Sequence, residues 1–125
     1  MKLSEVKAIV TGGAQGIGLC FATELHAAGA SVTVGDVNEA ALASLPEGIH
    51  RRRLDVSDEA DIAAFVTFAR ASMGGLNVLV NNAGIIRDGL LVKKDRVTGA
   101  VTRLSTADWN AVIGVNLTGA TFMVR

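Results

Sequence analysis

Short apolar runs alternate with helical patterns along the whole chain. The runs lie at residues 6–10, 31–35, 49–55 and 76–80 and predict strands. Between them, apolar residues recur at spacings of about three and four, as in helices that bury one face. This alternation predicts an α/β fold in which a doubly wound parallel sheet is covered by helices on both faces.

Four helices are predicted from residues that favour helix ends. Residues with a side-chain oxygen are preferred at the N-cap because the oxygen accepts hydrogen bonds from the free N–H groups of the first turn. Glycine and proline are typical of helix ends. The first predicted helix covers 17–28, and the fourth continues to the end of the chain. N-caps are predicted at Asn38, Ser57 and Ser105, and helix ends at Gly29, Pro46 and Gly74.

A long segment separates the fourth strand from the fourth helix. Its part at 90–104, LLVKKDRVTGAVTRL, consists of two short extended stretches around Thr98 and Gly99, which predicts a β-hairpin. In an open α/β sheet, a loop that leaves the C-terminal end of a strand lies at the ligand crevice. Three interpretations stay open for this hairpin: a lid, an oligomer contact, or surface decoration.

Composition narrows the class of protein. The chain has 125 residues, which fits one domain, and its 12 basic and 12 acidic side chains cancel. It lacks the basic surface that nucleic-acid binding needs, and no apolar stretch is long enough to span a membrane. The single cysteine, Cys20, fits a reducing cytoplasm, and its apolar neighbours predict a buried structural thiol. We expect a cytoplasmic protein with no nucleic-acid partner, membrane partner or metal site.

The stretch TGGAQGIG, at 11–18, follows the first predicted strand and opens the first helix. Gly12, Gly16 and Gly18 suit a turn in which backbone N–H groups and the helix dipole meet a phosphate. No Gly-Lys-Ser/Thr follows, so the stretch is not a P-loop. A plain tight turn is the alternative.

Asp36 ends the second predicted strand, 18 residues after Gly18. A carboxylate at this position accepts hydrogen bonds from both hydroxyls of an adenosine ribose and repels a 2′-phosphate, which predicts NAD rather than NADP. Gln15 agrees, because a basic residue in the glycine turn would favour that phosphate. A solvated turn aspartate is the alternative.

Three further polar sites follow along the chain. Asp55 has two interpretations of equal weight: it meets the adenine amino group, or it supports the cap around Ser57. The run Asn81-Asn82-Ala83-Gly84 suits a crowded strand end, or an ordinary turn. Asn116 lies on an apolar helix face, where a core hydrogen bond is the alternative to a catalytic or water-holding role.

Together these motifs resemble the short-chain dehydrogenase/reductase family. In order they are TGGAQGIG, Asp36, LDV at 54–56, NNAG at 81–84 and VNLTG at 115–119. The resemblance covers essentially all of this chain but only the N-terminal half of a family member. It implies a Rossmann-type fold and hydride transfer between NAD and an alcohol or carbonyl substrate. The stretch at 85–91 is also similar to reductases of 3-oxoacyl thioesters, although those relatives usually prefer NADP, which disagrees with Asp36.

The resemblance also implies roles for particular residues. The pyrophosphate is assigned to Gly12, Gln15, Gly16, Ile17 and Gly18. The adenosine half is assigned to Asp36 for the ribose and to Asp55 and Val56 for the adenine. The ribose on the nicotinamide side is assigned to Asn82, Ala83 and Gly84. Asn116 matches the catalytic asparagine of the family, which holds a water in a proton relay.

The chain departs from the family pattern in its catalytic groups. It contains no tyrosine, so the acid/base pair Tyr-x-x-x-Lys is absent, and it ends at Arg125 before the strand of the catalytic serine. We expect residues 1–125 to be the NAD-binding portion of one domain, cut within the fourth helix and inactive alone. This portion would need a C-terminal half or a partner chain to complete it, and we expect the protein to form a homo-oligomer. The alternatives are a non-catalytic nucleotide-binding or scaffold module and another Rossmann-type protein such as a methyltransferase.

Overall fold

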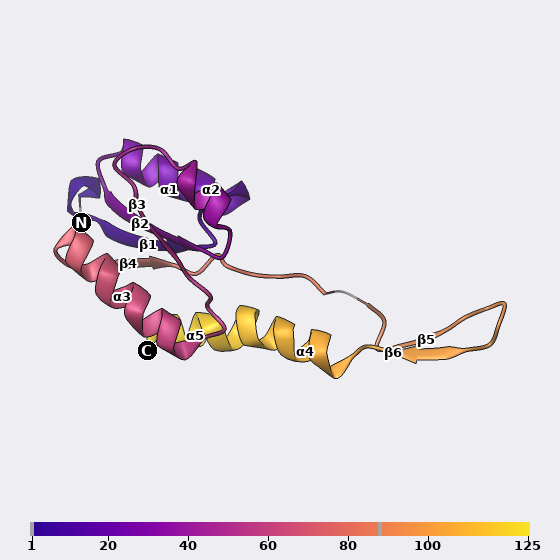
Figure 1. Ribbon diagram of the computed structural model, residues 1–125. Helices are drawn as coiled ribbons and strands as arrows, with labels where there is room; N and C mark the ends of the chain where they lie inside the picture. Colours follow the sequence, from indigo (N-terminus) through magenta and orange to yellow (C-terminus); the bar gives the residue numbers. More distant parts are fainter. Residues whose placement is uncertain (1, 88) are drawn as a thin grey trace.

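The computed structural model describes residues 2–87 and 89–125. Its body is a parallel sheet of four strands in the order β3-β2-β1-β4 (Figure 1). The strands are β1 (Lys7–Thr11), β2 (Ser31–Asp36), β3 (His50–Arg53) and β4 (Val78–Val80). From β1 the chain adds β2 and β3 on one side and then places β4 on the other side of β1. This switch of side is typical of a doubly wound sheet. The predicted α/β fold is confirmed.

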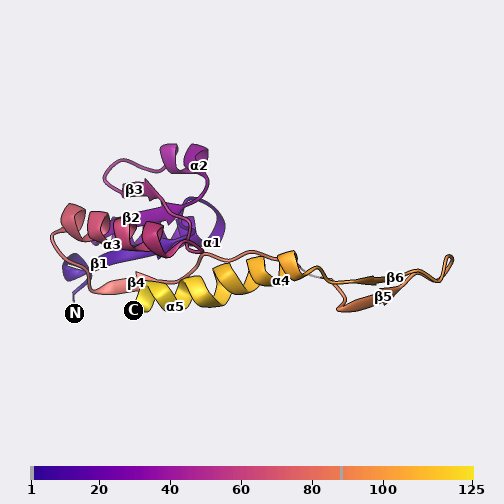
Figure 2. The same cartoon turned by 60° about the horizontal axis from the view of Figure 1, so that its bottom comes forward.

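Helices cover both faces of the sheet (Figures 1 and 2). One face carries α1 (Gly16–Ala27) and α2 (Glu39–Ala43), and the other carries α3 (Glu59–Met73) and α5 (Ala120–Val124). Side chains of β1 alternate between two apolar cores, because successive residues of a strand point to opposite faces. Val10 belongs to the core under α1 and α2, and Ile9 to the core that contains Phe65 and Met123.

Most of the predicted helix ends are confirmed. Asn38 caps α2 by accepting the N–H of Ala41 at 3.0 Å, and Gly74 ends α3 in the left-handed conformation with φ 64°. Ser105 caps α4 (Thr106–Ile113) by accepting the N–H of Asp108 at 3.0 Å. These contacts join residues at most three positions apart, so the local sequence was enough to predict them.

The N-cap of α3 was predicted one residue too early. Asp58, not Ser57, accepts the N–H groups of Ala60 and Asp61, at 2.9 and 3.2 Å. The Ser57 hydroxyl instead donates to Asp55 at 2.6 Å. Because Ser57 is held by Asp55, the next carboxylate takes the cap, and aspartate is as good an N-cap as serine.

Cys20 is exposed on α1, so the predicted burial is wrong. The buried stripe of α1 passes through Gly18 and Ala22, with Leu19 and Leu25 packed beside it. Position 20 lies about 200° around the helix from position 18. The side chain of Cys20 therefore points away from the sheet despite its apolar neighbours in the sequence.

The last helical segment runs from α4 through a π-helical stretch, η2 (Gly114–Gly119), into α5 without a break (Figure 2). Short π segments are rare and are often found at functional sites. Gly119 is pressed against the loop before α3, since a Cβ there would lie 2.5 Å from the carbonyl oxygen of Val56. This close approach fixes the helix beside the carboxyl end of the sheet.

The predicted hairpin is confirmed between β4 and α4. Strands β5 (Val92–Lys94) and β6 (Val101–Arg103) pair antiparallel, and Gly99 has φ 71° in the turn. Both views show the hairpin projecting well away from the sheet (Figures 1 and 2). In the part of the chain that the structure describes, no helix is both long and apolar enough to cross a membrane.

Candidate nucleotide-binding site

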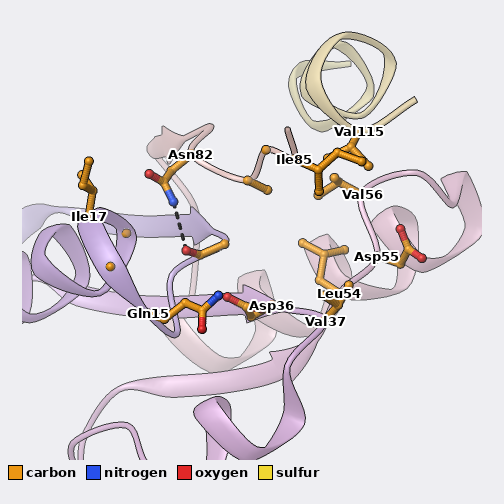
Figure 3. A pocket seen from close by; sticks show the side chains of 15 residues that line it. Gln15, Ile17, Asp36, Val37, Leu54, Asp55, Val56, Asn82, Ile85 and Val115 are labelled. Carbon is orange, nitrogen blue, oxygen red and sulfur yellow. Dashed lines mark hydrogen bonds between the residues drawn. The ribbon is translucent and has the colours of Figure 1, made fainter. Parts of the chain in front are cut away.

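A pocket of about 460 Å³ lies at the carboxyl ends of β1, β2 and β4 (Figure 3). It brings together every residue that the sequence assigned to cofactor binding: Gly12, Gln15, Gly16, Ile17, Gly18, Asp36, Asp55, Val56, Asn82, Ala83 and Gly84. The residues that sequence reasoning missed are apolar: Val37, Leu54, Ile85 and Val115. Each of them stands next to a predicted residue or within a quoted motif, so adjacency was the available signal. Asn116 does not line the pocket.

The glycine turn is built by close backbone contacts. Gly12 and Gly16 have φ 61° and 56°, in the left-handed region that glycine adopts most readily. At Gly18 a Cβ would lie 2.3 Å from the carbonyl oxygen of Gly12 and 2.4 Å from Nδ2 of Asn82. Gly18 therefore permits α1 to approach the end of β1, whereas Gly16 has a different role.

The N-terminus of α1 faces open space in the pocket. Its N-cap, Gln15, makes no side-chain cap hydrogen bond, and a Cβ placed on Gly16 would meet no atom within 4 Å. The first N–H groups of a helix have no partner within the helix, and its dipole favours negative charge there. The shape and polarity of this end fit a phosphate group.

Asp36 is fixed at the end of β2 and is only 6% exposed, so it is not a solvated turn residue. Its Oδ2 accepts the N–H of Ala14 at 3.1 Å, and its Oδ1 accepts the N–H of Asn38 at 3.0 Å. A carboxylate oxygen can accept about two hydrogen bonds, so each retains capacity for one hydroxyl group. The bond to Ala14 also ties the glycine turn to β2.

Asp55 lies at the other end of the pocket, beside Val56, whereas Asp36 lies beside Gln15 (Figure 3). Its Oδ1 accepts both the hydroxyl and the N–H of Ser57, at 2.6 and 3.0 Å. The hydroxyl bond, followed by the backbone bond, holds the pKa of Asp55 below its ordinary value of 3.8. Of the two interpretations, the support of Ser57 is observed, and the contact with adenine stays a prediction.

Asn82 ties the end of β4 to the glycine turn. Its Nδ2 donates to the carbonyl oxygens of Thr11 and Gly12, at 3.1 and 2.9 Å, the latter drawn as a dashed line in Figure 3. The Thr11 hydroxyl oxygen in turn accepts the N–H groups of Asn82 and Ala83, at 3.1 and 3.0 Å. Thr11 is 1% exposed and had no functional prediction. These bonds fix two walls of the pocket relative to each other.

Asn116 holds the segment that leaves β4. Its Oδ1 accepts the N–H of Ile85 at 2.8 Å, and its Nδ2 donates to the carbonyl oxygen of Ile85 at 2.9 Å. Asn116 lies inside η2, and the Cβ of a side chain at Gly84 would meet its Oδ1 at 3.5 Å. The observed role is a pair of backbone hydrogen bonds, and the predicted catalytic role remains untested.

The family model for short chain dehydrogenases matches residues 6–125. The chain belongs to this family. Over 128 residues it is 36% identical to Nodulation protein G of Rhizobium sp. (strain N33). The matched region covers 99% of this chain and 48% of that protein. It is 38% identical over 130 residues to 3-oxoacyl-[acyl-carrier-protein] reductase FabG of Thermotoga maritima, covering 95% of this chain and 47% of the reductase. The chain thus spans about half the length of the curated relatives it matches.

Two solved structures of short-chain dehydrogenase type are similar in fold. A 3-ketoacyl-(acyl-carrier-protein) reductase from Brucella melitensis, complexed with NADH, matches with a TM-score of 0.81 at 28% identity, covering 98% of this chain and 49% of that one. A short chain dehydrogenase/reductase from Burkholderia phymatum, in complex with NAD, matches with a TM-score of 0.84 at 29% identity, covering 100% and 43%. Both similarities extend over the strands and helices that form the pocket.

Proposed function

We propose that residues 1–125 bind NAD as the cofactor-binding portion of a short-chain dehydrogenase/reductase domain. The observation that carries the proposal is Asp36, a buried carboxylate that retains acceptor capacity at one end of the pocket. The uncapped N-terminus of α1, with open space at Gly16, lies in the same pocket. An anion at the helix and a ribose diol at Asp36 are the two features by which a dinucleotide is held.

The residues present fit this cofactor along its length. The N–H groups of the glycine turn would hold the pyrophosphate, and Asp36 would accept the ribose hydroxyls. Leu54 and Val56, both buried, would form an apolar wall for the adenine. Ala83 and Gly84, which have small or no side chains, leave room for the ring at the β4 end. When bound, the reduced nicotinamide ring would donate a hydride to a carbonyl substrate, and the oxidised ring would accept one from an alcohol.

We infer that the proton of the reaction comes from a group other than the side chains that line this pocket. Among residues 2–87 and 89–125, the ionisable side chains that line the pocket are Asp36 and Asp55, and neither lies on the β4 side to which we assign the nicotinamide half. Asn116 bonds the backbone of Ile85, and an amide does not titrate near neutral pH. We therefore assign substrate binding and acid/base catalysis to a C-terminal segment or partner chain. The substrate is an alcohol or carbonyl compound, and a 3-oxoacyl thioester is the first candidate to assay.

The test is to titrate the full-length protein with NADH and with NADPH and to monitor binding by the fluorescence of the cofactor. Alcohol and ketone substrates are then added to measure turnover. Preferential binding of NADH with turnover supports the proposal. The described residues that line the pocket include no acid on the β4 side, and this favours one rival, a nucleotide-binding module without catalysis. Tight NADH binding with no turnover in the full-length protein would select that rival. Binding of S-adenosylmethionine without NADH would contradict both.

A further inference from the structure

The hairpin and its flanks, residues 89–104, are here called the arm. Both views show the arm extending beyond α4, away from the sheet (Figures 1 and 2). Five large apolar side chains of the arm are more than half exposed: Leu90, Leu91, Val92, Val97 and Val101. An isolated two-stranded hairpin is marginally stable in water. Burial of these side chains against another surface would therefore stabilise the arm.

The arm is strongly basic. Its charged residues are Lys93, Lys94, Arg96 and Arg103, with Asp95 as the single carboxylate. Asp95 is engaged in its own turn, where Oδ1 accepts the N–H groups of Val97 and Thr98, at 2.9 and 2.7 Å. Within residues 2–87 and 89–125, the ion pairs join Arg53 to Asp61 and Arg125 to Glu59, so none involves an arm cation. The arm thus presents positive charge that forms no ion pair with the other described residues of its own chain.

One face of the hairpin combines this charge with apolar surface. Val92 is opposite Arg103, and Lys94 is opposite Val101. Because alternate residues of a strand share a face, these four side chains lie together, whereas Lys93 lies on the other face. We call this set of Val92, Lys94, Val101 and Arg103 the docking face. Two valines beside two cations suit a partner surface that is acidic and partly apolar.

The complementary charge is found on the opposite part of the same chain. Residues 8–50 contain no lysine or arginine and hold four carboxylates. Asp36 is buried in the pocket, and Glu24, Glu39 and Glu47 are exposed on α1, on α2 and on the loop after α2. We call the surface with these three glutamates the acidic layer. It covers one face of the sheet, and the arm projects away from it in both views (Figures 1 and 2).

The nearest cation in the sequence, Arg51, forms no ion pair with the glutamates of the acidic layer. The guanidinium of Arg51 donates to the carbonyl oxygens of Leu42, Leu45, Pro46 and Ile49, at 2.7–3.2 Å. It is therefore engaged in closing the loop after α2. The exposed glutamates keep their charge available for a partner.

We infer that the arm binds the acidic layer of a second copy of this chain through the docking face. Contact between two arms would place like charges together, which is strongly unfavourable, whereas contact between arm and layer matches their signs. The arm and the layer are different surfaces, so two copies can close a symmetric pair by exchanging both arms. This inference is independent of the nucleotide site.

The direct test is carbodiimide cross-linking of the full-length protein, which joins lysine amines to carboxylates in contact. Isotopically labelled and unlabelled protein are mixed, so that cross-links between copies carry one labelled and one unlabelled peptide. We expect mixed-label links from Lys94, which lies on the docking face, to Glu24, Glu39 or Glu47. Arm links found only within one copy, or only to surfaces other than the acidic layer, would overturn the inference.

Matched charge variants test the docking face itself. Lys94→Glu should raise the dissociation constant of self-association, measured by sedimentation, about tenfold or more, because it places like charges in contact. Lys93→Glu, with the same change of charge on the opposite face, is the control and should have a much smaller effect. Combining Lys94→Glu with Glu47→Lys should recover part of the loss. Equal behaviour of the two arm variants, or binding of the arm to polyglutamate but not to a second copy, would contradict the inference.

Discussion

Replacement of Asp36 by alanine tests the assignment of the ribose. In the proposed complex, the carboxylate accepts hydrogen bonds from two ribose hydroxyls. Hydrogen bonds to a charged acceptor are strong, so losing this contact should cost about 1.5–3 kcal/mol of binding free energy in total. We therefore expect Asp36→Ala to weaken NADH binding by roughly tenfold to a hundredfold. The same change removes the repulsion of a 2′-phosphate, so NADPH binding should weaken less or improve.

The structure shows why both cofactors must be measured. Asp36 also accepts the N–H of Ala14, at 3.1 Å, and this bond holds the glycine turn. A loosened turn would lower the affinity for NADH and NADPH alike, because both carry the pyrophosphate. Loss of the ribose contact lowers the affinity for NADH more than the affinity for NADPH, which carries a phosphate in place of the 2′-hydroxyl. The ratio of the two dissociation constants therefore separates the two causes.

The assay is a fluorescence titration with NADH and with NADPH at one fixed ionic strength, on the full-length protein and the Asp36→Ala variant. Asp58→Ala is a suitable control, since Asp58 caps α3 and does not line the pocket. The Asp58→Ala variant should have the same ratio of dissociation constants for NADH and NADPH as the unmodified protein. Equal affinity of the unmodified protein for the two cofactors would refute the reasoning. An unchanged ratio in Asp36→Ala would refute it as well.

Four further predictions concern Gly18, Gly16, the bond between Asp55 and Ser57, and the edge of the sheet. Gly18→Ala should lower the melting temperature, since overpacking typically costs about 1–3 kcal/mol; Gly16→Val should leave most of the fold intact but abolish NADH binding, and retained binding by a folded variant would contradict the site. Because the pKa of Asp55 is depressed in the fold, its contribution to stability is present above pH 3.8 and is lost as the pH falls through the lower folded value; Ser57→Ala should weaken this acid dependence in urea unfolding measured across that range. A polypeptide of residues 1–125 alone should self-associate in light scattering, because β4 is an edge strand with its outer side unpaired, and a soluble monomer that melts cooperatively would show otherwise.

Local signals made much of the fold predictable. Asn38 and Ser105 each bond a residue three positions away, so their sequence neighbourhoods contained both partners. The pocket was also predictable, for a different reason. The carboxyl ends of adjacent parallel strands meet at one edge of the sheet, so the residues after each strand converge even though they are far apart in the sequence.

The parts that could not be predicted depend on competition or on helix phase. Ser57 is a good cap residue, but it is held by Asp55, and no rule of sequence ranks these two partners. Cys20 has apolar neighbours, yet the phase of α1 is set by the contact of Gly18 with the end of β1. The direction of the hairpin depends on how α4 leaves the sheet, and its own residues carry no signal for it.

The two asparagines connect the fold to the function. Asn82 bonds the carbonyl oxygens at the end of β1, and Asn116 bonds the backbone of Ile85 after β4. Each asparagine bonds a different element of the fold, and its partners lie 31 to 71 positions away in the sequence. The amide of Asn82 donates to two carbonyl oxygens, whereas the amide of Asn116 donates and accepts at once, so each satisfies backbone groups that a strand end leaves free. These bonds at the carboxyl edge of the sheet therefore also hold Gly12 and Ile85, two residues that line the pocket. For this reason the described residues already form the pocket to which we assign the cofactor.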